Sequence, residues 1–238
     1  MRRMVILRAV LIALCLGPAV VMATLRVVTN DIDSVTNPGL LVVGVAVILG
    51  GIGSAILAAG VFGQEYDLAT ARGLLLRGVP RWSFLAAKVV SILAVMTAGG
   101  LISVGFGLTC AVAAGWETSL AEAVSLFVKT ATLVPLSSLV YLAAAGLGAV
   151  VGRSSAAGML VGLMLFLTGF VLATLQAHYP LVGWFPETNL FSILGGDFAA
   201  ALGIESATMA SAVSRLIALG AGLLAAAAAL FDRQDLTG

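Results

Sequence analysis

Six apolar runs, each long enough to cross a lipid bilayer, make up most of this 238-residue chain. A helix needs about 20 mostly apolar residues to cross the hydrocarbon core of a membrane. Hydrophobic residues form 61% of the sequence and charged residues only 10%, whereas soluble proteins contain about 25% charged residues. We therefore expect an all-α integral membrane protein with a single transmembrane domain over residues 1–238. The six expected transmembrane helices are residues 5–25, 39–62, 84–114, 123–151, 156–174 and 213–231.

The first apolar run has two interpretations. It follows a basic start at Arg2 and Arg3 and ends in Val-Met-Ala, which also fits a secretory signal peptide. The apolar core of a signal peptide is about 7–15 residues long, shorter than this run. We therefore interpret residues 5–25 as a membrane span.

Lys and Arg residues are divided unequally between the two sides of the expected spans. Nine of the twelve lie on one side and three on the other. Because cytoplasmic segments of membrane proteins are enriched in Lys and Arg, we expect both termini to be cytoplasmic and the protein to be multi-pass in the cell membrane. The nine residues are Arg2, Arg3, Arg8, Arg72, Arg77, Arg81, Lys88, Arg153 and Arg233, and the three are Arg26, Lys129 and Arg215.

The longest segment between two spans is the outer segment, residues 176–212. It mixes Pro, Asp and Glu with apolar patches, so it is too polar to cross a bilayer and too apolar for a free loop. We expect short interfacial or re-entrant helices here, between the fifth and sixth spans. Such a segment could serve as a gate, a lid or a docking site for an external partner.

Residues suited to catalysis are scarce. The one histidine, His178, has no Cys or carboxylate at metal-ligand spacing, and we expect it to be a polar loop residue. Ser54 lies deep in the second span, away from His178, and a serine nucleophile needs a base within hydrogen-bond reach. Cys15 and Cys110 lie inside apolar runs and are typical of small buried hydrophobic residues. We predict no catalytic residue, no cofactor and no metal site, and the net charge of +1 argues against nucleic acid as a partner.

A phosphate-binding loop is excluded by the lysines. The motif requires a lysine directly after a glycine and before Ser or Thr. The two lysines, Lys88 and Lys129, follow Ala87 and Val128. If ATP drives this protein, ATP and Mg²⁺ therefore bind to another polypeptide.

Lys129 is an unusual charge, because it lies within the first two turns of the expected fourth span. A charge at the centre of a bilayer costs about 2.5–3.5 kcal/mol on insertion scales, and less near the interface. Two interpretations stay open. Lys129 could be an anchor that reaches the interface and pairs with Glu117 or Glu122, or it could be a cationic point on a substrate path.

Small residues recur at four-residue spacing within three of the expected spans. On a helix this spacing makes a flat face that lets a second backbone come close. We expect most of these residues to pack within the bundle, with a subunit interface as the alternative. They are Gly99, Ser103 and Gly107, then Gly148 and Gly152, then Gly158 and Gly162.

The most densely charged stretch is residues 64–83, which we call the coupling segment. It separates the second span from the third and must lie outside the hydrocarbon, and its cationic excess indicates the cytoplasmic side. Its candidate partner-contacting residues are Glu65, Tyr66, Asp67, Thr70, Arg72, Arg77 and Arg81, and Lys88 follows at the start of the third span.

These residues resemble the signature of ABC transporter permeases of the type 2 exporter class. In that family an acidic residue ends the second span. A Gly-Thr pair, a leucine-rich turn, a Pro-x-Ser-Arg stretch and a lysine at the start of the third span follow it. This sequence departs from the pattern at Ala69, Gly78 and Pro80, and its residues 231–235 resemble the family's usual ending. The residues that match are Glu65, Tyr66, Thr70, Leu74, Leu75, Leu76, Arg77, Arg81 and Lys88.

The resemblance implies a permease subunit of an ATP-driven exporter, embedded in the lipid bilayer. Such a subunit pairs with a second permease, identical or homologous, and each permease docks a cytoplasmic ABC ATPase subunit. The coupling segment would include a helix that sits in a cleft of the ATPase, with Arg72, Arg77 and Arg81 facing acidic residues. The alternative is a non-transporting membrane anchor, or a signalling or assembly subunit, that recruits a cytoplasmic partner through the same segment.

Overall fold

Regular structure in this chain is helical throughout the part that the computed structural model describes, which is residues 2–29, 38–67, 80–113, 115–173, 183–195 and 208–233. No strand occurs within these residues, so the predicted all-α class is confirmed for them. The helices are α1 (Arg2–Thr29), α2 (Pro38–Asp67), α4 (Arg81–Ala113), α5 (Leu120–Gly152), α6 (Ser155–Ala173), α7 (Pro186–Leu194) and α9 (Met209–Arg233).

Five of these helices, α2, α4, α5, α6 and α9, are long and apolar enough to cross a membrane. The predicted multi-pass membrane character is thereby confirmed. The first helix differs, because its apolar stretch within the described residues is only Val5–Val21. Arginines lie near both of its ends, at Arg2, Arg3 and Arg26, and shorten that stretch.

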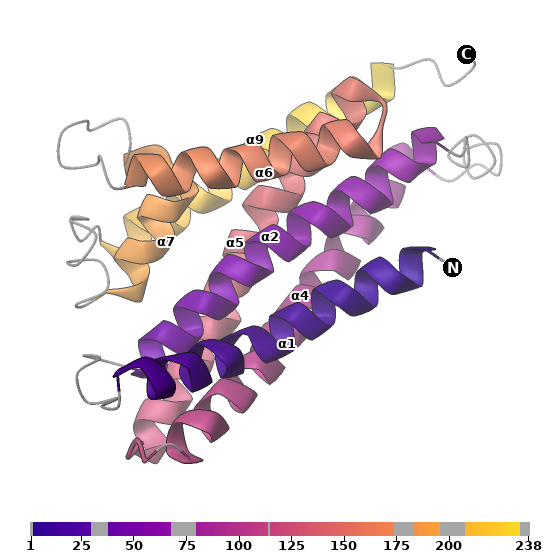
Figure 1. Cartoon of the computed structure of the whole chain (residues 1–238). Coiled ribbons are helices and arrows are strands. Elements are labelled where there is room, and N and C mark those ends of the chain that lie inside the picture. Colours follow the sequence, from indigo (N-terminus) through magenta and orange to yellow (C-terminus); the bar gives the residue numbers. More distant parts are fainter. Residues whose placement is uncertain are drawn as a thin grey trace.

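The long helices lie side by side, and each runs roughly opposite to the one before it (Figure 1). Helix α1 begins, α2 ends, α4 begins and α9 ends at the same end of the bundle. We call this the charged end, because the coupling segment joins Asp67 of α2 to Arg81 of α4 there. The short helix α7 lies at the opposite end, which we call the α7 end.

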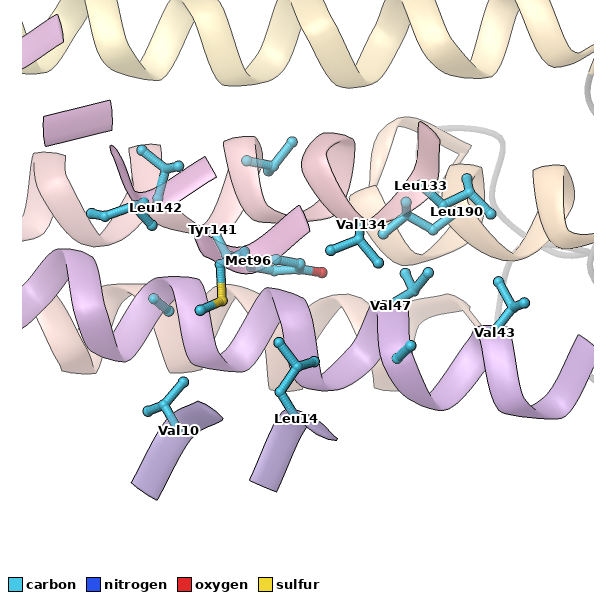
Figure 2. Close-up of a cluster of buried hydrophobic side chains, with 14 of the residues drawn as sticks. Val10, Leu14, Val43, Val47, Met96, Leu133, Val134, Tyr141, Leu142 and Leu190 are labelled. Carbon is cyan, nitrogen blue, oxygen red and sulfur yellow. The ribbon is translucent and has the colours of Figure 1, made fainter. Parts of the chain in front are cut away.

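Helices α2 and α5 form the centre of the bundle. Helix α2 contacts α1, α4, α5, α6 and α7, and α5 contacts α2, α4, α6, α7 and α9. Their facing side chains form one buried apolar cluster, which also takes in Val10 and Leu14 of α1 and Met96 of α4 (Figure 2). Lipid tails are as apolar as these side chains, so the cluster holds the helices together by close packing rather than by escape from water.

The small residues at four-residue spacing pack within the chain, as predicted. A Cβ atom at Gly158 of α6 would lie 2.7 Å from the carbonyl oxygen of Ala145 in α5. A Cβ at Gly162 would lie 2.9 Å from the Cβ of Ala55 in α2. The glycines therefore let three backbones approach more closely than any larger residue would permit.

Pro135 lies inside the continuous helix α5. The two serines that follow it connect α5 to α2. The hydroxyl of Ser137 donates to the carbonyl oxygen of Val47 at 3.2 Å, and that of Ser138 donates to the carbonyl oxygen of Gly50 at 3.4 Å. Interhelical hydrogen bonds of this kind are worth about 0.6–2 kcal/mol in membrane proteins, so they add directly to the packing of α2 on α5.

Replacing Gly158 with Ala should destabilise the bundle by about 1–3 kcal/mol, because the new methyl group would force α6 away from α5 and α2. We expect a lower midpoint of thermal unfolding for the purified protein in mild detergent, followed by circular dichroism. The matched control is Gly222→Ala in α9, where a Cβ would meet nothing within 4 Å. Equal midpoints for the two variants would contradict the proposed role of the glycine contact.

Candidate functional site

Two polar clusters stand out in the otherwise apolar part of the chain that the structure describes. One surrounds Lys88 near the charged end. The other surrounds Glu187, on the short helix α7. Only the first coincides with residues that the sequence singles out.

The predicted coupling residues lie partly on helices. Glu65, Tyr66 and Asp67 form the last turn of α2, which extends beyond the expected span end at residue 62. Arg81 is the first residue of α4. The remaining three, Thr70, Arg72 and Arg77, lie outside the described residues.

Lys88 connects α4 to α2 beside the coupling segment. Its ammonium group donates a hydrogen bond to the carbonyl oxygen of Val61 in α2, at 2.9 Å. The same nitrogen lies 4.1 Å from the ring centroid of Phe84 and 5.4 Å from that of Phe62. Aromatic faces attract cations, and more strongly where water is excluded. The two helices that flank the coupling segment, α2 and α4, are therefore held together by a charged side chain.

Glu187 is the second residue of α7 and is only 2% exposed. One oxygen of its carboxyl group, Oε1, accepts a hydrogen bond from the hydroxyl of Tyr141 in α5. The other oxygen, Oε2, has no hydrogen-bond partner among the described residues. It lies against Gly169 of α6, where a Cβ atom would overlap it. A glycine at this position of α6 is therefore required for the carboxyl group to occupy its site.

A small cavity of about 10 Å³ adjoins the Glu187 carboxyl group. This volume is close to the minimum for one water molecule. Aromatic packing encloses the region, since Tyr141 meets Phe166 edge to face with ring centroids 5.8 Å apart. The cavity is lined by Val47, Ile48, Ser137, Tyr141, Phe166, Glu187, Leu190 and Phe191.

No described cation neutralises Glu187. Arg215 of α9, a helix that packs against α7, donates to the carbonyl oxygen of Gly183 at 3.1 Å and lies over the ring of Trp184. Burial raises the pKa of Glu187, which lies outside the five candidate spans, from an ordinary 4.5 to about 7. The hydrogen bonds from Tyr141 and from the backbone lower this pKa and offset only part of the burial.

In the sequence, Glu187 is one of three acidic residues of the outer segment, with Asp197 and Glu205, and nothing in its neighbours marks it for burial. The start of a helix was visible there, because Pro186 is followed by an acidic residue, as at many helix N-termini. Burial was not visible, because it depends on Tyr141, which is 46 positions away, and on Gly169. A short helix within the outer segment was expected, and α7 is such a helix.

Lys129 is half-buried on α5 and forms no ion pair with Glu117 or Glu122 in the part of the chain that the structure describes. Glu122 instead helps to start α5, where its backbone N–H donates to the hydroxyl of Ser119 at 3.2 Å. A role for Lys129 in a substrate path stays a prediction.

The other candidate residues for chemistry in the sequence are Ser54, His178, Cys15 and Cys110. Ser54 is buried, and its hydroxyl donates to the carbonyl oxygen of Gly51 in its own helix, at 2.7 Å. His178 lies outside the described residues. Both cysteines, Cys15 and Cys110, are free thiols. Within the described ranges, no three His, Cys, Asp or Glu residues gather closely enough to hold a metal ion.

Comparison of the chain with protein-family models, with curated proteins and with solved structures finds no match. The resemblance to exporter permeases therefore depends on the residues of the coupling segment and on the order of the helices.

Glu187 should make the stability of the protein depend on pH. Its pKa of about 7 in the folded state exceeds the ordinary 4.5, so the folded state binds the proton more tightly. The free energy of unfolding should therefore fall as the pH rises from about 5 to 7, and it should stay low above about pH 7. The upper bound for this decrease is about 3 kcal/mol. Thermal unfolding in detergent across this pH range measures the effect, and Glu187→Gln should remove it. An unchanged pH profile in that variant would show that another group is responsible.

Lys88 and Phe84 should stabilise the junction of α2 and α4 jointly. A double-mutant cycle with Lys88→Met and Phe84→Leu should give a coupling free energy of about 0.5–2 kcal/mol, the range for cation–aromatic contacts. Detergent-induced unfolding provides the four stabilities. A control cycle with Lys129→Met and Phe84→Leu should be additive, because Lys129 lies near the opposite end of the bundle. Additivity in both cycles would mean that the Lys88–Phe84 contact contributes nothing.

Proposed function

We propose that this chain is the transmembrane permease subunit of an ATP-driven ABC exporter in the cell membrane. In this proposal the chain crosses the membrane six times, with α1 as the first span and both termini in the cytoplasm. It pairs with a second permease, identical or homologous. Cytoplasmic ABC ATPase subunits bind ATP and Mg²⁺ and act on the coupling segment.

The observation that carries the proposal is the path of α2. This helix runs unbroken from Pro38 to Asp67, so it joins the coupling segment to the centre of the bundle. It contacts α1, α4, α5, α6 and α7. A force applied to the coupling segment would therefore reach most of the bundle through one rigid element, which is what conversion of ATP-driven motion into a change of packing requires.

The contact around Lys88 supports the same proposal. Lys88, near the start of α4, donates a hydrogen bond to the carbonyl oxygen of Val61, near the end of α2. The two helices that flank the coupling segment are therefore linked close to that segment. A partner that pushed on the segment would move α2 and α4 together rather than spread them apart.

The alternative is a membrane anchor, or a signalling or assembly subunit, that recruits a cytoplasmic protein without transporting anything. It would use the same charged segment but would not need a continuous connection to the far end of the bundle. Glu187, buried at that far end beside α2, favours the transport proposal, because a buried ionisable group whose pKa is strongly shifted by its surroundings is a candidate functional site.

Co-purification in mild detergent with a candidate ABC ATPase subunit tests the proposal. Wild-type protein should retain the ATPase and stimulate its ATP hydrolysis. Glu65→Arg and Arg81→Glu should reduce retention or stimulation at least tenfold, because each places a like charge opposite the partner's complementary group. The variants lie at the last turn of α2 and the first residue of α4.

Glu117→Arg is the matched control, since it reverses a charge in the turn before α5, at the end of the bundle away from the coupling segment. It should retain and stimulate the ATPase as wild type does. If wild-type protein binds no ATPase, the exporter proposal fails. If the ATPase binds but all three variants behave alike, the coupling segment is not the docking element.

A further inference from the structure

The environment of Glu187 favours a neutral carboxylic acid. The side chain is 2% exposed, and its Oε2 oxygen lies against Gly169 of α6 with no hydrogen-bond partner among the described residues. The free energy needed to move a charged carboxylate from water into such surroundings is far larger than that for a neutral carboxylic acid. A buried carboxyl group without a counter-charge therefore takes up a proton.

The titratable groups on the elements packed against α7 do not supply that counter-charge. From α5 the Tyr141 hydroxyl reaches the carboxyl group. The charged residues of α5, Glu122 and Lys129, lie at least twelve positions before Tyr141, about 18 Å or more along the helix. Helix α6 contains no ionisable residue, and the acidic residues of α2 lie in its last turn, at the charged end. From α9, Arg215 is held by the carbonyl oxygen of Gly183 and by the ring of Trp184.

We propose that Glu187 is a proton-binding site that holds α7 against α5 and α6. With the proton bound, the neutral acid fits between Tyr141 and the backbone at Gly169. When the proton leaves to water, the charge that remains requires hydration that the cavity of about 10 Å³ has little room to provide. Helix α7 then separates from α6 and exposes the carboxylate, which opens the α7 end of the bundle.

The proposal stands apart from the exporter assignment, because it depends only on contacts among α5, α6 and α7. Its effect would be a gate at one end of the bundle whose position depends on pH. Tyr141 is a positioning residue in this scheme. It stabilises the charged form by its hydrogen bond and therefore sets the pH at which the gate opens.

Infrared difference spectroscopy of the purified protein, recorded between pH 5 and pH 9, tests the proton directly. Wild type should show the C=O stretching band of a protonated carboxylic acid that disappears with a midpoint near pH 7. The band should be missing in Glu187→Gln. In Tyr141→Phe its midpoint should move to higher pH, because the hydrogen bond to the charged form is lost. A merely structural tyrosine would leave the midpoint unchanged.

A cysteine probe tests the movement of α7. In a Cys15→Ser, Cys110→Ser background, Ser192→Cys introduces a thiol on α7 at a position that is 6% exposed in wild type. The rate at which a membrane-impermeant maleimide labels this thiol should rise about tenfold between pH 6 and pH 8. This rise is measured relative to that of a control thiol, Glu117→Cys, over the same pH range. That factor is about the change in the deprotonated fraction of a group with a pKa near 7. Adding Glu187→Gln should abolish the excess.

Four results would overturn the proposal. The first is an infrared band that is absent from wild type at every pH, or that persists in Glu187→Gln. The second is labelling of Ser192→Cys with the pH dependence of the control thiol alone. The third is loss of the band on adding sodium at constant pH, which would make Glu187 a metal-cation site. The fourth is an infrared midpoint that is the same in Gly169→Ala as in Gly222→Ala, because a methyl group at Gly169 should displace the carboxyl group and move the midpoint.

Discussion

The close approach of α2, α5 and α6 is the contact on which the rest of the structure depends. Glycine and alanine at the facing positions bring the three backbones together, and a methyl group at Gly158 would already crowd the carbonyl oxygen of Ala145. In lipid the hydrophobic effect does not drive one apolar helix against another, so packing at short distance must supply the stability. Serine hydroxyls can reach a neighbouring helix's carbonyl groups only at such distances, as Ser137 does.

The same close packing determines which partners the buried polar groups contact. Glu187 reaches its site because Gly169 leaves room for its carboxyl group, and Tyr141 meets it from a neighbouring helix. Lys88 reaches the carbonyl oxygen of Val61 because α4 packs on α2 near the charged end. Each polar group lies where two or more helices meet, and each therefore reports on how those helices are arranged.

Helix α2 relates the two polar clusters to each other. Val61, near one end of α2, accepts the hydrogen bond from Lys88, and Val47, nearer the other end, lines the cavity beside Glu187. A displacement of α2 would therefore alter both clusters. In the proposed exporter this arrangement connects the site of ATPase docking to a gate at the opposite end of the bundle, without a separate chain of signalling residues.

The sequence alone determined the helical class and the approximate limits of the long helices, because apolar length and flanking charges are local properties of the chain. It also indicated that the small residues at four-residue spacing, such as Gly158 and Gly162, pack within the bundle. Only the tertiary structure revealed the Glu187 site. The burial of a carboxyl group depends on which residues of distant helices surround it, and neither Tyr141 nor Gly169 is marked for this role by its sequence neighbours. The contact of Lys88 with α2 was decided in the same way, by the packing of one helix on another.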